Sequence, residues 1–232
     1  LAPRIEQIAG GRVYLRIISN LADLRLARAK AVFRAEDIGG PEVVDGIILA
    51  AELAVVDPYR AATHNKGIMN GVTAVVLATG NDTRAVEAGA HSYASRTGRY
   101  MSLTRYERNR DGDLVGTIEL PVAVGLVGGA TRVHPVAKTA VKILAVKSAD
   151  DLSRKIAAVG LCQNFAALRA LASEGIQRGH MSLHARNVAV QAGAKCDLIE
   201  LVAARMAAER RINVDRAAEL IRELEDRGQE GV

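Results

Sequence analysis

The sequence predicts an α+β fold, in which a small number of strands is combined with a larger number of helices. Two observations predict this class. Val13, Leu15 and Ile17 alternate with their neighbours over residues 12–18, as side chains do in a half-buried strand. Beyond residue 135 the apolar residues recur at the helical period up to the end of the chain. With 232 residues, of which 49% are hydrophobic, the chain can bury a substantial core.

Local patterns predict the elements of the first hundred residues. They are extended segments at 12–18 and 25–33, a helix from Val43 to Asp57-Pro58 that ends before a loop, and a closely packed helix at 84–93. The stretch 72–79 is short, apolar and rich in β-branched residues. Its pattern fits a buried strand and part of a core helix equally well.

The second half begins with a hairpin and continues as helices. The expected elements are hairpin strands at 100–107 and 114–120, a helix at 135–147, one long helix or two shorter ones over 152–171, and helices at 182–191, 197–210 and 215–227. Asp111-Gly112 supplies the positive φ angles of a tight reversal. Asn213 and Asp215 are candidate helix caps. Residues from about 175 onward are expected to form a separate helical module.

Composition excludes several classes of function. No run of eighteen uncharged apolar residues occurs, so no membrane span is expected. The net charge is +5, but only 3% of residues are aromatic and the basic residues are scattered, which argues against nucleic acid and favours a polyanionic small molecule. Cys162 and Cys196 have no metal or redox spacing, and we expect buried thiols in a reducing compartment. The chain opens at Leu1, and we expect an N-terminal part to be missing.

Three segments carry candidate chemistry. The run from Asp57 to Asn70 gathers Arg, His, Asn and Lys side chains, which fits an anion site and a basic surface loop about equally. Asp82 follows an apolar run, where a helix cap is the commoner role. His180 follows a glycine near an expected helix start, where it fits a mobile acid–base group or an ordinary surface residue.

These segments together resemble the class II 3-hydroxy-3-methylglutaryl-CoA (HMG-CoA) reductases. The resemblance extends in order over nearly all of the chain. It rests on Thr63-His64-Asn65-Lys66-Gly67, Thr79-Gly80-Asn81-Asp82, Val124-Gly125-Leu126-Val127-Gly128-Gly129-Ala130-Thr131 and Gly179-His180-Met181-Ser182-Leu183-His184-Ala185-Arg186-Asn187. Within the class, the chain is most similar to the bacterial degradative enzymes, which use NAD to oxidise mevalonate.

The resemblance implies a role for each candidate residue. Lys66 would stabilise the developing negative charge on the oxygen of the mevaldyl thiohemiacetal, and Asp82 would hold that lysine in place. His180 would exchange a proton with the CoA thiol. The substrate's carboxylate and hydroxyl end would be held by Arg60 and Asn70, with Gln163 and Asn164 as weaker candidates near the same pocket.

The resemblance also implies a division of the chain. Residues 1–18 would be the tail of a small ferredoxin-like dinucleotide-binding domain, 19–174 a large mixed α/β domain for CoA, substrate and dimerisation, and 175–232 a helical flap that carries His180. The family's catalytic glutamate and its Asp-Ala-Met-Gly-Ala-Asn segment have no counterpart here, so we expect no turnover by this chain alone. NAD is the expected cofactor rather than NADP, without a metal, in a cytoplasmic homodimer or assembly of dimers.

The sequence leaves two alternatives open. One is a truncated, non-catalytic remnant that binds acyl-CoA, or one piece of a split enzyme. The other is a basic domain that binds nucleic acid, which the composition disfavours.

Overall fold

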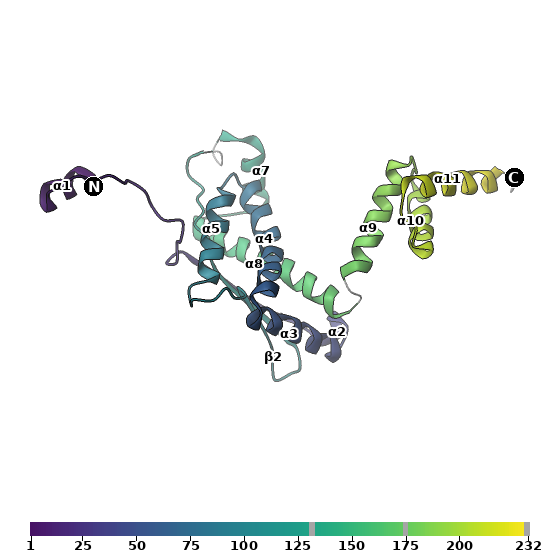
Figure 1. Cartoon of the computed structure of the whole chain (residues 1–232), viewed down its shortest axis with the longest axis horizontal. Helices are drawn as coiled ribbons and strands as arrows, with labels where there is room; N and C mark the ends of the chain where they lie inside the picture. Colours follow the sequence, from purple (N-terminus) through teal and green to yellow (C-terminus); the bar gives the residue numbers. More distant parts are fainter. Residues whose placement is uncertain (130–132, 174–175, 230–232) are drawn as a thin grey trace. The chain divides into compact units, whose positions relative to one another are not determined.

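The structure is mostly helical and contains one small antiparallel sheet (Figure 1). This computed structural model describes residues 1–129, 133–173 and 176–229, with the backbone alone for 176–183 and 225–229. The strands are β1 (Leu26–Phe33), β2 (Thr104–Arg108) and β3 (Leu114–Pro121). The helices are α1 (Ala2–Ala9), α2 (Ala35–Ile38), α3 (Pro41–Val56), α4 (Pro58–Ala78), α5 (Thr83–Ala94), α7 (Pro135–Ile143), α8 (Ala149–Ala172), α9 (Ile176–Gln191), α10 (Asp197–Glu209) and α11 (Val214–Gln229).

The chain divides into two compact units, residues 1–168 and 169–232. Each unit has its own core. In the second unit, α9, α10 and α11 bury small and aliphatic side chains against one another, among them Val188, Val202, Met206 and Leu220. Asn213 stands before α11, and its side chain accepts a hydrogen bond from the Arg216 backbone N–H at 2.8 Å, which confirms the predicted cap. No helix in the described part of the chain is long and apolar enough to span a membrane.

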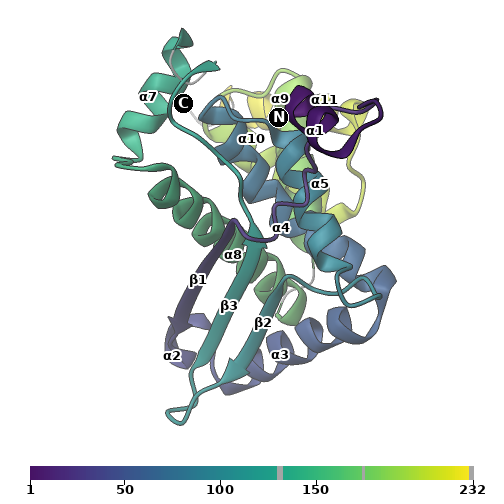
Figure 2. The ribbon, with the colours of Figure 1, turned by 90° about the vertical axis from the view of Figure 1, so that its left-hand side faces the viewer.

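In the first unit the sheet has the order β1-β3-β2 and is antiparallel throughout (Figure 2). The predicted hairpin is confirmed, since β2 and β3 are joined by a turn in which Gly112 has a φ of 89°. Asn109 stabilises this turn, because its side-chain oxygen accepts the backbone N–H groups of Asp111 and Asp113.

One face of the sheet packs against α8, which crosses behind the strands (Figure 2). Gly116 of β3 leaves room for Tyr106 and Leu161, since a Cβ there would lie 2.8 Å from a ring carbon of Tyr106. Phe33 at the end of β1 stacks on Phe165 of α8, with ring centroids 3.8 Å apart. The helix predicted over 152–171 is therefore one continuous element, and it forms the core beneath the sheet.

The expected strand at 12–18 is wrong. Residues 12–19 form no strand, and Tyr14, Leu15, Ile17 and Ile18 are exposed. An alternating pattern supplies only one face of a strand, and a strand also needs a hydrogen-bonded neighbour. Within the described residues no segment pairs with 12–18, so the pattern alone does not produce a strand.

Two further expectations are corrected. Residues 57–70 are not a loop, because α4 begins at Pro58 and runs through this segment to Ala78. The ambiguous stretch 72–79 is the second half of the same helix. The cysteines are not buried either, since Cys162 and Cys196 are both exposed free thiols in the structure.

Candidate active site

Helix α4 carries three of the seven candidate site residues, Arg60, Lys66 and Asn70, and it starts at a strong capping signal. Pro58 occupies the first turn, where its missing N–H leaves no donor unsatisfied. The Asp57 carboxylate accepts hydrogen bonds from the backbone N–H groups of Tyr59, at 3.0 Å, and Arg60, at 3.3 Å. The dense polar segment therefore lies on a rigid helix, where side-chain spacing is set by the helical repeat.

The two faces of α4 have different surroundings. One face is buried against the rest of the unit and includes His64, Asn65 and Ile68. Lys66 and Asn70 lie on the exposed face, one turn apart, so their side chains are neighbours. Arg60 is half-buried in the first turn, and desolvation lowers the pKa of its guanidinium.

Helix α8 approaches α4 closely beside Asn70. A Cβ added to Gly71 would lie 2.9 Å from the Cβ of Gln163 and 3.1 Å from the backbone oxygen of Val159. Gln163 itself is exposed, so its amide is accessible next to Asn70 and Gly71. The structure thus brings Gln163 to Gly71, the residue that follows Asn70 on α4.

Asn164 has different surroundings from its neighbour. It is 2% exposed, and its side-chain oxygen accepts hydrogen bonds from the hydroxyls of Thr104, at 2.9 Å, and Tyr106, at 3.0 Å. Burial raises the pKa of Tyr106, which keeps its phenol protonated as the donor in this pair. The Asn164 oxygen is therefore used within the core.

His64 belongs to the same buried network. Its Nε2 lies 2.6 Å from the hydroxyl of Thr104, whose hydrogen is already donated to Asn164, so this pattern assigns the proton to Nε2. Burial, with a smaller contribution from the charge of Arg60, lowers the pKa of His64 to about 4. The imidazole is therefore neutral at pH 7, and its Nδ1 has no hydrogen-bond partner among the described residues.

Asn65 connects α4 to the segment before β2. Its amide nitrogen donates to the backbone oxygen of Met101 at 2.8 Å, and its oxygen accepts the backbone N–H of Leu103 at 3.0 Å. Asn65 and His64, the two residues before Lys66, therefore attach α4 to residues 101–104. Sequence reasoning treated them as part of a donor-rich segment and did not identify this structural role.

Asp82 caps α5, and its carboxylate accepts the backbone N–H of Ala85 at 3.1 Å. The residue before it, Asn81, is hydrogen bonded through its backbone N–H to Val76. Val76 lies ten residues, or about 15 Å of helix, beyond Lys66. The structure therefore does not bring Asp82 to Lys66 within one chain.

Asn81 joins two of the conspicuous segments. Its side-chain oxygen accepts the backbone N–H of Gly125 at 2.9 Å, which ties the turn before α5 to the start of the glycine-rich segment. Residues 130–132 of that segment lie outside the described residues. The same is true of the His180 side chain, although its backbone lies in α9, which starts at Ile176 rather than at the predicted Ser182.

Comparison with known proteins places these features in a family. The model of the family "Hydroxymethylglutaryl-coenzyme A reductase" matches residues 1–185. A 3-hydroxy-3-methylglutaryl-coenzyme A reductase of Archaeoglobus fulgidus is 62% identical over 97% of this chain and 51% of its own length. A probable enzyme of the same name from Borreliella burgdorferi is 40% identical over 77% of this chain and 42% of its own length.

Solved structures give the same result. A class II 3-hydroxy-3-methylglutaryl-CoA reductase of Streptococcus pneumoniae, bound to NADPH in open conformations, matches with a TM-score of 0.72 and 39% identity. The match covers 97% of this chain and 56% of that one. The chain thus spans about half the length of the relatives that it matches.

Proposed function

Because the chain belongs to the hydroxymethylglutaryl-coenzyme A reductase family, we propose that it supplies the lysine-bearing part of an enzyme that interconverts (R)-mevalonate plus CoA and HMG-CoA. The reaction transfers two hydrides between a nicotinamide cofactor and one carbon. The observations that support the proposal are that Lys66 and Asn70 lie one turn apart on the exposed face of α4, and that Gln163 of α8 lies against the neighbouring Gly71.

Lys66 is suited to stabilise a developing oxyanion. It is exposed on α4, while the opposite face of this helix is anchored in the core, so its backbone position is fixed. The nearby His64 is neutral at pH 7 and adds no competing positive charge beneath it. Asn70, one turn away, would hold the substrate's hydroxyl, and Gln163 lies beside it. Arg60 would hold the carboxylate with two parallel hydrogen bonds.

Asp82 enters this proposal as a residue of a second copy of the chain. Within one chain about 15 Å of helix separates Lys66 from the turn that precedes Asp82. A homodimer in which α4 of one copy faces the start of α5 of its partner would place the carboxylate beside the ammonium. We therefore propose a shared site in a homodimer or an assembly of dimers.

The remaining assignments follow from the family. Residues 1–18 would belong to the dinucleotide-binding domain, 19–174 to the CoA- and substrate-binding domain, and 175–232 to a flap whose His180 exchanges a proton with the CoA thiol. The nicotinamide would supply the hydride. No described residues form a glycine-rich turn between a parallel strand and a helix, so no residue of this chain is assigned to the dinucleotide.

The proposal further includes NAD as the hydride carrier and mevalonate oxidation as the direction of the reaction. The decisive experiment compares NAD with NADP in mevalonate- and CoA-dependent reduction by the complete protein and its Lys66→Ala variant. The variant should lose hydride transfer with either carrier while it keeps the circular dichroism and melting temperature of the parent. Turnover that survives in Lys66→Ala would contradict the assignment.

A further inference from the structure

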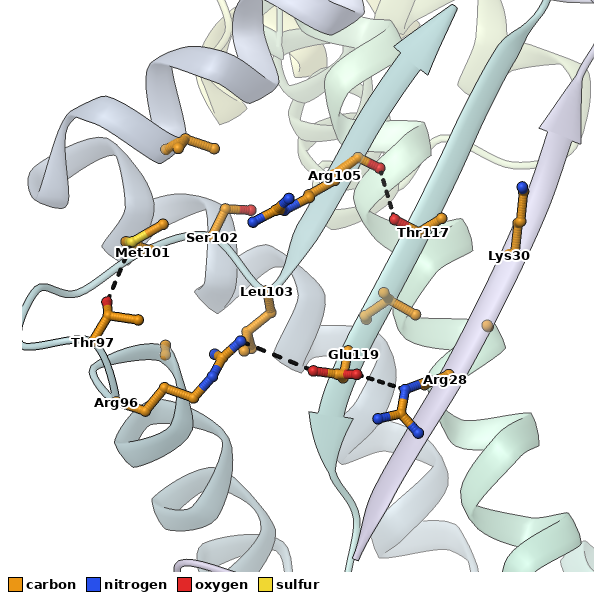
Figure 3. A pocket seen from close by; sticks show the side chains of 14 residues that line it. Arg28, Lys30, Arg96, Thr97, Met101, Ser102, Leu103, Arg105, Thr117 and Glu119 are labelled. Atoms are coloured by element: carbon orange, nitrogen blue, oxygen red, sulfur yellow. Dashed lines mark hydrogen bonds and ion pairs between the residues drawn. The ribbon is translucent and has the colours of Figure 1, made fainter. Parts of the chain in front are cut away.

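The face of the sheet that points away from α8 is hollowed by a cavity of about 590 Å³ (Figure 3). This volume lies in the range of small-molecule sites. None of the residues proposed above for catalysis lines it. The charged residues that line it come from the three strands and from the segment after α5, and they are Arg28, Lys30, Arg96, Arg105 and Glu119. Thr97, Ser102 and Thr117 add hydroxyl groups.

The strand register arranges these side chains in two rows. In the first row Lys30 of β1 and Arg105 of β2 are both paired with Thr117 of β3, so the threonine lies between two cations. In the second row Arg28 of β1 is paired with Glu119 of β3. Both rows lie on the cavity face, because residues two apart on a strand point to the same side.

The second row contains a carboxylate that pairs with its cations. Glu119 accepts a hydrogen bond from Arg28 at 2.5 Å and another from the hydroxyl of Tyr93, and it lies 3.9 Å from the guanidinium of Arg96. The hydrogen bond from Tyr93, supported by Arg28, lowers the pKa of Glu119, which is therefore a carboxylate at neutral pH. Figure 3 shows this carboxylate between Arg28 and Arg96.

The first row has no such anion. Thr117 occupies the central position that a carboxylate fills one row away, and its neutral hydroxyl makes only a long hydrogen bond, 3.5 Å, to the backbone oxygen of Arg105. Neither Lys30 nor Arg105 forms an ion pair with any residue whose side chain the structure describes. Two uncompensated cations therefore flank a hydroxyl at the wall of a cavity, on a rigid sheet.

We propose that this cavity binds a diphosphate group above Thr117, between Lys30 and Arg105. The guanidinium of Arg105 suits a phosphate through two parallel hydrogen bonds, Lys30 adds a point charge, and the Thr117 hydroxyl is a donor. The two cations stand on outer strands, about 10 Å apart between backbones. An anion with two linked charged groups fits this separation better than a single phosphate does.

Two probes distinguish a free diphosphate ion from a diphosphate that is part of an organic molecule. Isothermal titration of the full chain with inorganic pyrophosphate tests the charged group alone, and titration with adenosine diphosphate tests a diphosphate carried on an organic molecule. The apolar wall of Val55, Met101 and Leu103 could contact the organic part. Binding of both probes identifies an organic diphosphate, and binding of pyrophosphate alone identifies the free ion. If neither binds at low millimolar concentration in moderate salt, the proposal is overturned.

A pair of matched substitutions tests the mechanism. Thr117→Glu places in the first row the carboxylate that the second row already has, so it should weaken pyrophosphate binding by about tenfold or more. Glutamine has nearly the size of glutamate but no charge, so Thr117→Gln should bind pyrophosphate with an affinity within about threefold of the parent's. Equal binding by the two variants would overturn the proposal.

Further variants serve as controls for misfolding and for a general effect of net charge on pyrophosphate binding. Lys30→Gln and Arg105→Gln should each weaken binding about fivefold or more, whereas Arg84→Gln, at an exposed position of α5 outside the cavity lining, should leave it unchanged. Lys66→Ala should also bind pyrophosphate normally, so the cavity is tested independently of the proposed reaction. If Arg84→Gln weakens binding as much as Arg105→Gln does, the affinity reflects net charge and the site is refuted.

Discussion

His64 Nε2 and the Thr104 hydroxyl lie 2.6 Å apart in the core of the first unit, and this contact links α4 to the hairpin directly before Lys66. The pair continues to Asn164 of α8, so three elements meet at one hydroxyl. Because the imidazole is buried and neutral, its protonation is coupled to folding.

This coupling predicts a specific loss of stability in acid. The pKa of His64 is about 4 in the folded protein, against an ordinary value of 6.5 for histidine, so the unfolded chain binds the proton more readily between these values. The stabilising contribution is complete above pH 6.5 and is lost as the pH falls towards 4. It amounts to roughly 3 kcal/mol. Urea unfolding of the parent and of His64→Gln at several pH values should show a flatter profile for the variant. His184→Gln, at an exposed position, should keep the parent's profile, and parallel profiles for parent and His64→Gln would refute the coupling.

The two glycines of α4 should respond in opposite directions to alanine. A Cβ at Gly71 would come within 2.9 Å of Gln163 and 3.1 Å of the backbone of Val159, so Gly71→Ala must push α8 away. We expect it to destabilise by about 1–3 kcal/mol. Gly67, in the same helix, has nothing within 4 Å of its Cβ position, and Gly67→Ala should stabilise by about 0.5–1 kcal/mol. Thermal melts of the two variants measure the difference, and a stabilising Gly71→Ala would mean that the two helices do not cross this closely.

The Asp57 cap should contribute measurably to stability. Asp57→Ala removes the acceptor for the N–H groups of Tyr59 and Arg60, and it should lower the free energy of unfolding by about 1–2 kcal/mol. Asp111→Ala changes an exposed aspartate in the hairpin turn that caps no helix, and should have less than half of this effect. Equal losses of unfolding free energy in the two variants would show that Asp57 does not stabilise the protein through the helix cap.

The proposed shared site predicts complementation between inactive variants. Lys66→Ala and Asp82→Asn should each be inactive in the complete protein, and the asparagine keeps the cap of α5. In a dimer that draws one residue from each copy, mixed dimers retain one intact site. Co-expression of the two variants should therefore restore about a quarter of the parent activity. Activity no higher than that of the single variants would rule out a site that takes Lys66 and Asp82 from different copies.

The sequence predicted local structure well wherever local signals decide it. The Asp-Gly turn, the extended segment that became β1 and the Asn213 cap before α11 depend on neighbours in the chain. The segment 12–18 has the same alternation as a true strand, yet β1 is a strand because β3 pairs with it over its full length. Pairing partners are a property of the whole fold, and the pattern in one segment does not contain them.

The candidate site was predictable as a set of residues but not as an arrangement. The start of α4 was misjudged because Asp57-Pro58 was read as the end of one helix, although the same pair is a strong helix start. The different surroundings of Gln163 and Asn164 follow from which face of α8 meets the sheet. The two rows of the cavity depend on a register that brings residues 30, 105 and 117 together, which no local pattern encodes.

The position of Lys66 in the middle of a 21-residue helix has a mechanical consequence. The backbone of a lysine on a loop could move, whereas the backbone of Lys66 belongs to a helix whose opposite face is buried in the core. In the proposed reaction the ammonium would therefore keep its place, and substrate, cofactor and the second copy would have to approach it. Substitutions on the buried face of α4 should first lower the free energy of unfolding. Substitutions in the parts of the enzyme that approach Lys66 should first lower the turnover rate.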